Sequence, residues 1–184
     1  MNSYEASARL VFHFAREESE ALGHVAIDPE HLLLGLLRTN STANRLLLDA
    51  GATLSEARRL TRELTVQDAE AHRKNADVSL RTLRVMNRAG REAERLGSKR
   101  ISTEHILLGI LGEDDGVGYR VLQALIKYRE GLRQRILKAV AADGAAVELP
   151  RAYEGADSWR SNRLWEISYR LVSGRAPKPK TASD

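Results

Sequence analysis

The sequence predicts an all-α protein made of two tandem four-helix repeats, followed by one extra C-terminal helix. Leucine, alanine and arginine are abundant, there are only four prolines, and aromatic residues make up 5% of the chain. These residue types favour helix, and runs of β-branched residues typical of strands are absent. The third observation is a duplicated motif. Residues 30–37 read EHLLLGLL, and residues 104–111 read EHILLGIL, an offset of 104 minus 30, or 74. An internal repeat of this kind indicates one helical unit present twice, each copy burying its apolar face against the other.

The first repeat is expected over about residues 4–64. Apolar side chains at spacings of three and four predict its first helix over about residues 4–22, with Ser3 as the N-cap and Gly23 at the end. The motif then supplies the second helix, which is apolar on nearly all sides and must be buried.

Helix starts and stops in the rest of this repeat follow from capping residues. Asp28 is a suitable N-cap, and Pro29 fits the first helical position, where a missing N–H costs nothing. This second helix should end near Arg38. Two further helices are expected, one ending at Ala50 before Gly51, and one from about Ser55 to Leu64 or beyond.

Residues 65–77 are polar and should link the repeats, and the second repeat is expected over about residues 78–142. Its first helix should run over about 78–96 and stop at Gly97. The next helix is capped by the segment Ser102-Thr103-Glu104. The second repeat lacks a glycine equivalent to Gly51. Residues 125–128 therefore either carry the seventh helix straight into the eighth, which should end near Ala142, or break without glycine.

Residues 143–174 are expected to form a loop and an amphipathic helix over about 158–172, and residues 175–184 a disordered tail. The predicted helix carries Trp159 and Trp165, the only tryptophans of the chain. Large aromatic side chains either cover an apolar face of their own protein or anchor a partner. Because burial of such side chains is favourable, we expect the helix to fold back onto the repeats rather than stay exposed.

Composition narrows the classes of function. The chain has no cysteine, which excludes disulfides and thiolate chemistry. No apolar stretch reaches the length of a membrane span, so we expect a cytoplasmic protein without membrane contact. The net charge is +4, and arginines recur at helical spacing between Arg81 and Arg95. Interleaved glutamates make a solvated helix face the simpler interpretation, so nucleic acid is an unlikely partner.

The Glu-His-aliphatic-Leu-Leu-Gly motif occurs twice, and each copy is preceded by Leu-Gly and a helix start. With these features, residues 4–142 resemble the Clp N-terminal (Clp R) repeat domain. We therefore expect a first domain of this type over residues 1–142. The segment 113–122 is similar to the ClpC form. The resemblance implies a pair of four-helix repeats with pseudo-twofold symmetry that forms a protein-binding module rather than an enzyme. It would act as an adaptor, accessory factor or regulator of Clp-dependent proteolysis, with a Clp unfoldase, a ClpP-type protease, adaptors or substrates as partners.

No Gly-Lys dipeptide occurs anywhere in the chain, so no P-loop is present to hold nucleotide phosphates. We therefore expect a stand-alone Clp N-domain that needs no cofactor and does not bind ATP. Two alternatives remain. One is an accessory subunit that docks on the ClpP-type protease core, and the other is a basic helical regulator that binds nucleic acid.

Glu30 and Glu104 occupy the second position of their helices. A carboxylate in a first turn is stabilised by the helix dipole whatever its function. The resemblance adds that this glutamate lies in a pocket for phosphoarginine, with Ser102 and Thr103 beside it in the second repeat. A carboxylate suits the guanidinium, and helix N-termini suit the phosphate. Pro29 removes a backbone donor from the first repeat, so the second pocket is the better candidate.

The histidines of the two motifs, His31 and His105, have no ligand spacing for a metal, and we interpret them as packed or capping residues. No metal site is expected. No serine, histidine and aspartate arrangement for nucleophilic catalysis can be derived either, and this agrees with a binding protein.

Overall fold

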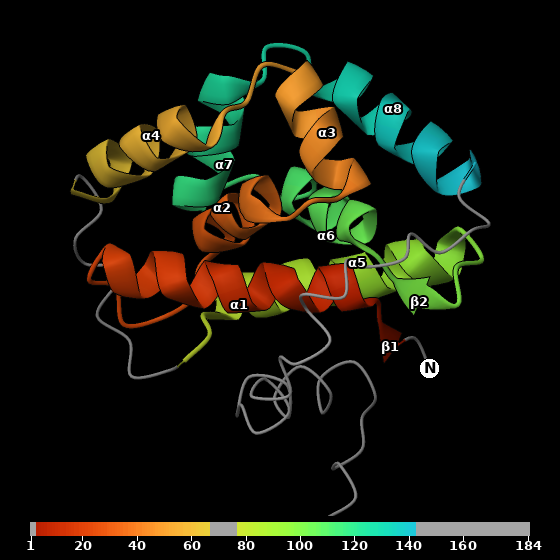
Figure 1. Ribbon diagram of the computed structural model, residues 1–184, viewed down its shortest axis with the longest axis horizontal. Coiled ribbons are helices and arrows are strands. Elements are labelled where there is room, and N and C mark those ends of the chain that lie inside the picture. Colours follow the sequence, from red (N-terminus) through yellow and green to blue (C-terminus); the bar gives the residue numbers. More distant parts are fainter. Residues whose placement is uncertain (1–2, 67–76, 143–184) are drawn as a thin grey trace, which may run out of the picture.

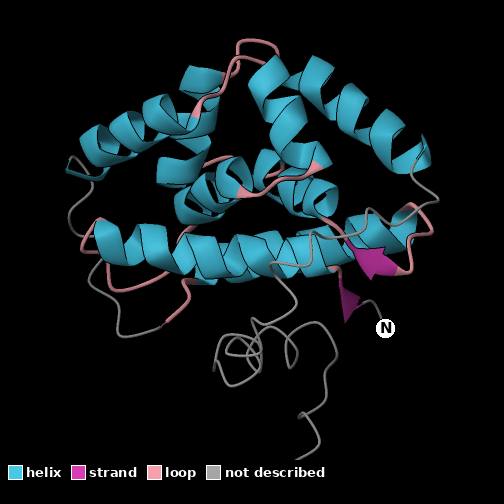
Figure 2. Cartoon of the chain, in the orientation of Figure 1, coloured by secondary structure: helices cyan, strands magenta, loops and turns pink. Residues whose placement is uncertain are grey.

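The structure of the chain is a computed structural model that describes residues 3–66 and 77–142. The all-α prediction is confirmed: within these ranges lie eight helices and one pair of two-residue strands (Figure 1, Figure 2). The elements are β1 (Ser3–Tyr4), α1 (Ala6–Ala21), α2 (Pro29–Arg38), α3 (Thr42–Asp49), α4 (Leu54–Val66), α5 (Leu80–Arg95), β2 (Arg100–Ile101), α6 (Thr103–Leu111), α7 (Gly116–Leu125) and α8 (Arg129–Ala142). None of the described helices is long and apolar enough to cross a membrane.

The helices form layers around the two motif helices, α2 and α6. In Figure 1, α1 and α5 run along the lower edge, α2 and α6 lie in the middle, and the other four helices form the upper part. All aliphatic side chains of α2 and α6 are buried except Leu111, which is partly buried. Helices that are apolar all round are stable only in such a central position.

Helix packing repeats itself between the two halves. Helix α1 packs on α2 as α5 packs on α6, and α2 contacts α7 as α6 contacts α3. The fourth helix of each repeat crosses to the other repeat, because α4 packs on α7 and α8 packs on α3. The two repeats are therefore interlocked, and each provides part of the other's apolar surroundings.

Backbone pairing between the repeats follows the same symmetry. Tyr4 pairs with Ile101 in the parallel strands β1 and β2, and the equivalent residues Val78 and Ile27 form a parallel bridge. The flanking hydrogen bonds also correspond: Glu5 N–H donates to the Ile101 carbonyl at 2.9 Å, and Ser79 N–H to the Ile27 carbonyl at 3.1 Å. These short pairings join the start of each repeat to the segment before the motif helix of the other.

The pairing corrects two predicted helix starts. Ser3 was expected to cap the first helix, but it lies in β1, and the N-cap of α1 is Glu5, without a side-chain cap hydrogen bond. Helix α5 begins at Leu80 rather than near Val78, because Val78 is held in the bridge and the Ser79 hydroxyl caps the helix by accepting from Thr82 N–H at 3.2 Å. In both cases a contact between distant segments keeps the residue extended.

The open question about residues 125–128 is also resolved. Ile126 ends α7 in an extended conformation, with φ −115° and ψ 102°, and α8 starts three residues later. The chain therefore leaves the helix without glycine. The side chain of Ile126 is only 2% exposed, so its burial in the core favours this extended conformation. The predicted helix over 158–172 lies outside the described residues, with the rest of 143–174, the tail 175–184 and most of the linker 65–77.

Candidate functional site

The candidate site residues lie at the N-termini of α2 and α6. Glu30 and Glu104 are the second residues of these helices, and their exposed fractions are only 2% and 6%. Ser102 and Thr103 are buried next to Glu104. The fold thus brings all four candidates to two helix starts, and it covers those starts with other parts of the protein.

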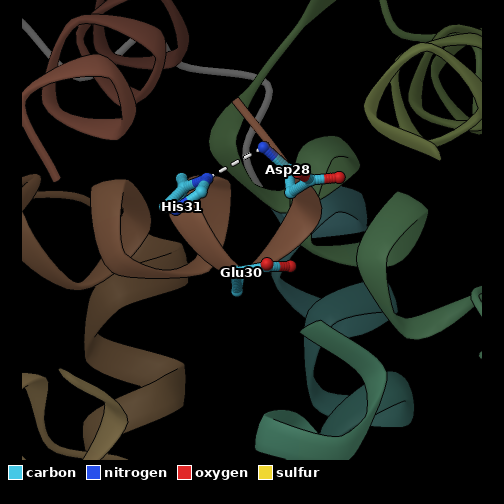
Figure 3. Close-up of side chains that lie close together, drawn as sticks. All are labelled: Asp28, Glu30 and His31. Atoms are coloured by element: carbon cyan, nitrogen blue, oxygen red, sulfur yellow. Dashed lines mark hydrogen bonds between the residues drawn. The ribbon is translucent and has the colours of Figure 1, made fainter. Parts of the chain in front are cut away.

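Each motif histidine closes the first turn of its helix. The backbone N–H of Asp28 donates to His31 Nδ1 at 2.8 Å (Figure 3). In the second repeat, the N–H of Ser102 donates to His105 Nδ1 at 3.0 Å. This is the reciprocal bond of a capping box, which glutamate or glutamine usually makes from the same position. The interpretation of the two histidines as capping residues is confirmed.

The cap determines which ring nitrogen of each histidine carries the proton. Because Nδ1 accepts, the neutral ring must carry its hydrogen on Nε2. In the first repeat, His31 Nε2 lies 2.7 Å from His24 Nδ1 and donates to it. In the second repeat, Ser98 stands at the position equivalent to His24, and the buried Nε2 of His105 has no partner. Burial lowers the pKa of His105, although the negative charges of Glu104 and Glu92 oppose this.

The first helix start also contains the only group in the described ranges with metal-ligand geometry. Ligand atoms of Asp28, Glu30 and His31 lie within 4.8 Å of one another. Figure 3 shows the two carboxylates extending to one side and the imidazole to the other. Both nitrogens of His31 already make hydrogen bonds, to the Asp28 amide and to His24. A metal at this position would have to break the helix cap or the histidine pair.

Two other buried carboxylates show how this protein usually neutralises such a charge. Glu18, 3% exposed, accepts from Arg38 at 2.9 Å and from Arg58 Nε at 2.9 Å. Burial by itself would raise the pKa of Glu18, but the hydrogen bonds and charges of Arg58 and Arg38 hold it below its ordinary value.

Glu113, 4% exposed, likewise has two arginine partners. Its carboxylate accepts from Arg88 at 2.7 Å and from Arg84 at 3.3 Å. Buried carboxylates are stable in proteins only when paired or hydrogen-bonded in this way.

Glu104 departs from this pattern. Its carboxylate accepts a hydrogen bond from the Thr103 hydroxyl at 3.0 Å, and no arginine or lysine of the described ranges pairs with it. The Ser102 hydroxyl is engaged with His105 Nδ1 at 2.8 Å. The start of α6 therefore holds a nearly buried carboxylate that has no counter-cation within residues 3–66 and 77–142.

At the start of α2, the backbone amide of Glu30 is covered by α7. A Cβ atom on Gly118 would lie 2.8 Å from Glu30 N and 2.9 Å from Pro29 Cβ, so the two backbones are in direct contact there. Pro29 itself has no N–H to offer. An external anion therefore cannot reach the Glu30 amide from the side of α7.

The arginines along α5, considered for nucleic acid, are mostly in ion pairs. Arg84 and Arg88 bind Glu113, Arg81 lies 3.3 Å from Asp115, and Arg95 lies 2.7 Å from Glu92. Their charges are partly neutralised within the protein. Trp159 and Trp165, the other candidate binding residues, lie outside the described residues.

Comparison with known proteins identifies similar sequences and a similar fold. The Clp repeat (R) N-terminal domain family matches residues 3–125. The negative regulator of genetic competence ClpC/MecB of Bacillus subtilis is 32% identical over 136 residues, which cover 74% of this chain and 17% of that protein. The chloroplastic chaperone protein ClpC of Pisum sativum is 30% identical over 138 residues, 74% of this chain and 15% of the relative.

Among solved structures, the N-terminal domain of the ClpD chaperone of Arabidopsis thaliana superposes with a TM-score of 0.61 at 26% identity, covering 74% of this chain and 96% of that domain. The chain thus spans about one sixth of the length of these two curated relatives but nearly the whole of an N-terminal domain.

Proposed function

Because the chain belongs to the Clp repeat (R) N-terminal domain family, we propose that it is a protein-binding module that acts as an adaptor, accessory factor or regulator of Clp-dependent proteolysis. Its partners would be a Clp unfoldase, an adaptor or a substrate protein. Docking on a ClpP-type protease core is the alternative within the same class.

The observation that carries the proposal is the carboxylate of Glu104. It is 6% exposed and pairs with no cation in the part of the chain that the structure describes, whereas Glu18 and Glu113 each have two arginines. A partner that supplies a guanidinium group would satisfy it, since charge-assisted hydrogen bonds of this kind are among the strongest in proteins. We therefore propose that the pocket at the start of α6, formed by Glu104 with Thr103 and Ser102, takes an arginine or phosphoarginine side chain.

The pocket is tested by titrating the protein with free phosphoarginine in a calorimeter. We expect Glu104→Gln, which keeps the shape of the side chain and removes its charge, to weaken binding about tenfold or more. Glu30→Gln should have a smaller effect, because Gly118 covers the Glu30 amide. An exposed control, Glu20→Gln, should bind as the unchanged protein does. No measurable binding by the unchanged protein would refute the pocket.

The wider proposal is tested with purified partners on a biosensor surface. Binding to a Clp unfoldase or to an adaptor would support a role in substrate delivery, whereas binding to the ClpP-type core alone would support the accessory subunit. Salt-dependent binding to DNA without affinity for any Clp component would contradict both and favour the nucleic-acid alternative.

A further inference from the structure

The two ends of the molecule carry opposite charge at positions that the internal repeat makes equivalent. Residues 91–100, which include the end of α5 and the first residue of β2, contain four basic and two acidic side chains, a net charge of +2. The equivalent residues 17–26, around the end of α1, contain three acidic and no basic side chains, a net charge of −3. In Figure 1, α5 ends beside β2 on the right, and α1 ends on the left.

The basic side chains around the end of α5 belong to one surface. The chain turns back tightly after the helix, because the Ser98 N–H donates to the Ala93 carbonyl at 2.9 Å, and β2 then contacts α5. Helix α8 joins them, since Arg133 lies 3.5 Å from Glu92, the carboxylate that Arg95 contacts at 2.7 Å. This basic surface consists of Arg91, Arg95, Lys99, Arg100 and Arg133.

Three cations of the basic surface have no counter-charge within the described protein. Arg91, Lys99 and Arg100 are exposed, and no carboxylate in residues 3–66 and 77–142 forms an ion pair with them. The other two arginines share the single carboxylate of Glu92. The surface therefore keeps a positive charge that a partner can neutralise.

The fold itself does not require these cations. A basic side chain near the C-terminus of a helix is favourable for the helix dipole, and Arg95 in the last turn of α5 fits this role. Helix α1 also has 16 residues and ends in the same turn, with the His24 N–H donating to the Ser19 carbonyl at 2.9 Å. It has no basic residue in its last turn. The same backbone thus forms without the positive charge.

A second copy of the chain is not the partner that this surface fits. Its acidic end is already neutralised within the molecule, because Glu17 pairs with Arg38 at 2.6 Å and Glu20 pairs with Arg16 at 2.9 Å. The complementary charge therefore has to come from a different protein.

We propose that the basic surface binds an acidic segment of a partner protein through the carboxylates of its aspartate or glutamate side chains. Four of its five cations are arginines, and a guanidinium can hold both oxygens of a carboxylate at once. Nucleic acid fits less well, because Glu94 is exposed in the last turn of α5 and would repel a regular row of phosphates. This second binding surface goes beyond the proposed function, since its ligand contains neither arginine nor phosphoarginine.

The experiment measures the binding of a fluorescein-labelled peptide of alternating glutamate and glycine to the full chain by fluorescence anisotropy. The double variant Lys99→Glu with Arg100→Glu should weaken binding about tenfold or more at low salt, because attraction between charges becomes repulsion. Arg91→Glu, a change confined to α5, should lower the affinity in the same direction. Added salt should weaken binding by the unchanged protein, and melting temperatures are measured alongside to show that each variant is folded.

The matched control reverses two exposed cations outside the basic surface, Arg62→Glu in α4 and Lys127→Glu between α7 and α8. Both double variants lower the net charge from +4 to 0, since each reversal removes two units. The control should bind the peptide nearly as well as the unchanged protein does. An equal loss of binding in both double variants would show that only net charge matters, and this would overturn the inference.

Other occupants of the basic surface give different results. The chain's own residues 143–157 contain four acidic side chains and one arginine. If the peptide binds only after these four are replaced by asparagine and glutamine, the surface belongs to that segment, and the inference is wrong. Tighter binding of a single-stranded oligonucleotide of the same charge would assign the surface to nucleic acid and overturn it as well, as would the absence of peptide binding to any form. None of these results depends on whether phosphoarginine binds.

Discussion

At the scale of single residues, the histidine of each motif copy serves the local backbone. His31 and His105 each accept the N–H of the N-cap residue, so the Glu-His pair combines a first-turn carboxylate with a capping group. This role could be predicted from position alone, because both histidines are the third residue of a capped helix. The contact between His24 and His31 could not, since His24 lies in a loop whose path depends on tertiary packing.

The lowered pKa of His105 predicts a dependence of stability on pH. Below about pH 6.5 the unfolded chain binds a proton on this residue more readily than the folded chain does. Its contribution to stability is therefore present above that pH and declines as the pH falls. We expect the free energy of unfolding, measured with urea between pH 7.5 and 5, to fall less steeply in His105→Gln than in the unchanged protein.

Glutamine is the right replacement because it can make the same capping bond without titrating. His13→Gln is the control: this exposed histidine contacts Glu17 at 3.2 Å on the surface of α1. It should leave the pH dependence nearly unchanged. Identical pH profiles for His105→Gln and the unchanged protein would show that the burial of His105 does not affect stability in this range.

At the scale of elements, two glycines determine how closely the helices pack. A Cβ atom on Gly35 would come within 3.0 Å of the Val11 carbonyl oxygen, and one on Gly109 would do the same at Val85. Helices α1 and α2, and likewise α5 and α6, are thus in backbone contact at equivalent points. The motif shows that these glycines recur, but only the packed helices show what each one touches.

We expect Gly109→Ala to lower the free energy of unfolding by about 1–3 kcal/mol, because the added methyl group has to push two helix backbones apart. Arg91→Ala, at an exposed position of α5, is the control, because it changes a helix residue without touching the contact between α5 and α6. Urea unfolding of both variants tests the prediction, and a loss at Arg91 as large as that at Gly109 would contradict it.

At the scale of the whole molecule, the interlocked repeats make one folding unit. Helix α4 packs on α7 and α8 packs on α3, so each repeat alone would expose the faces that these contacts bury. Cleavage in the linker region at 65–77 should therefore give two fragments, neither of which unfolds cooperatively. Mixing them should restore helicity, as circular dichroism can measure. A cooperative melting transition in either isolated fragment would show that a repeat folds independently.

Removal of the segment after Pro150 tests the predicted helix over 158–172. The described core ends at Ala142, so the shortened chain should stay folded. If the helix with Trp159 and Trp165 folds back, truncation lowers the melting temperature and exposes apolar surface to a dye, since burial of one large side chain contributes about 1.5–3 kcal/mol. Unchanged stability, dye binding and association state would mean that the segment is an independent appendage.

The sequence by itself determined the helices, their order and their duplication, because apolar spacing, capping residues and glycine stops are local signals that recur at a constant offset. It also pointed to Glu30 and Glu104. Only the tertiary structure decided what surrounds them. The structure joins segments that lie far apart in the chain. Helix α4 packs on α7 and α8 packs on α3, and backbone pairing holds Ser3 and Val78 extended. Gly118 of α7 lies against Glu30 of α2. That no described arginine or lysine pairs with Glu104 is likewise a property of neighbours in space, which no local pattern encodes.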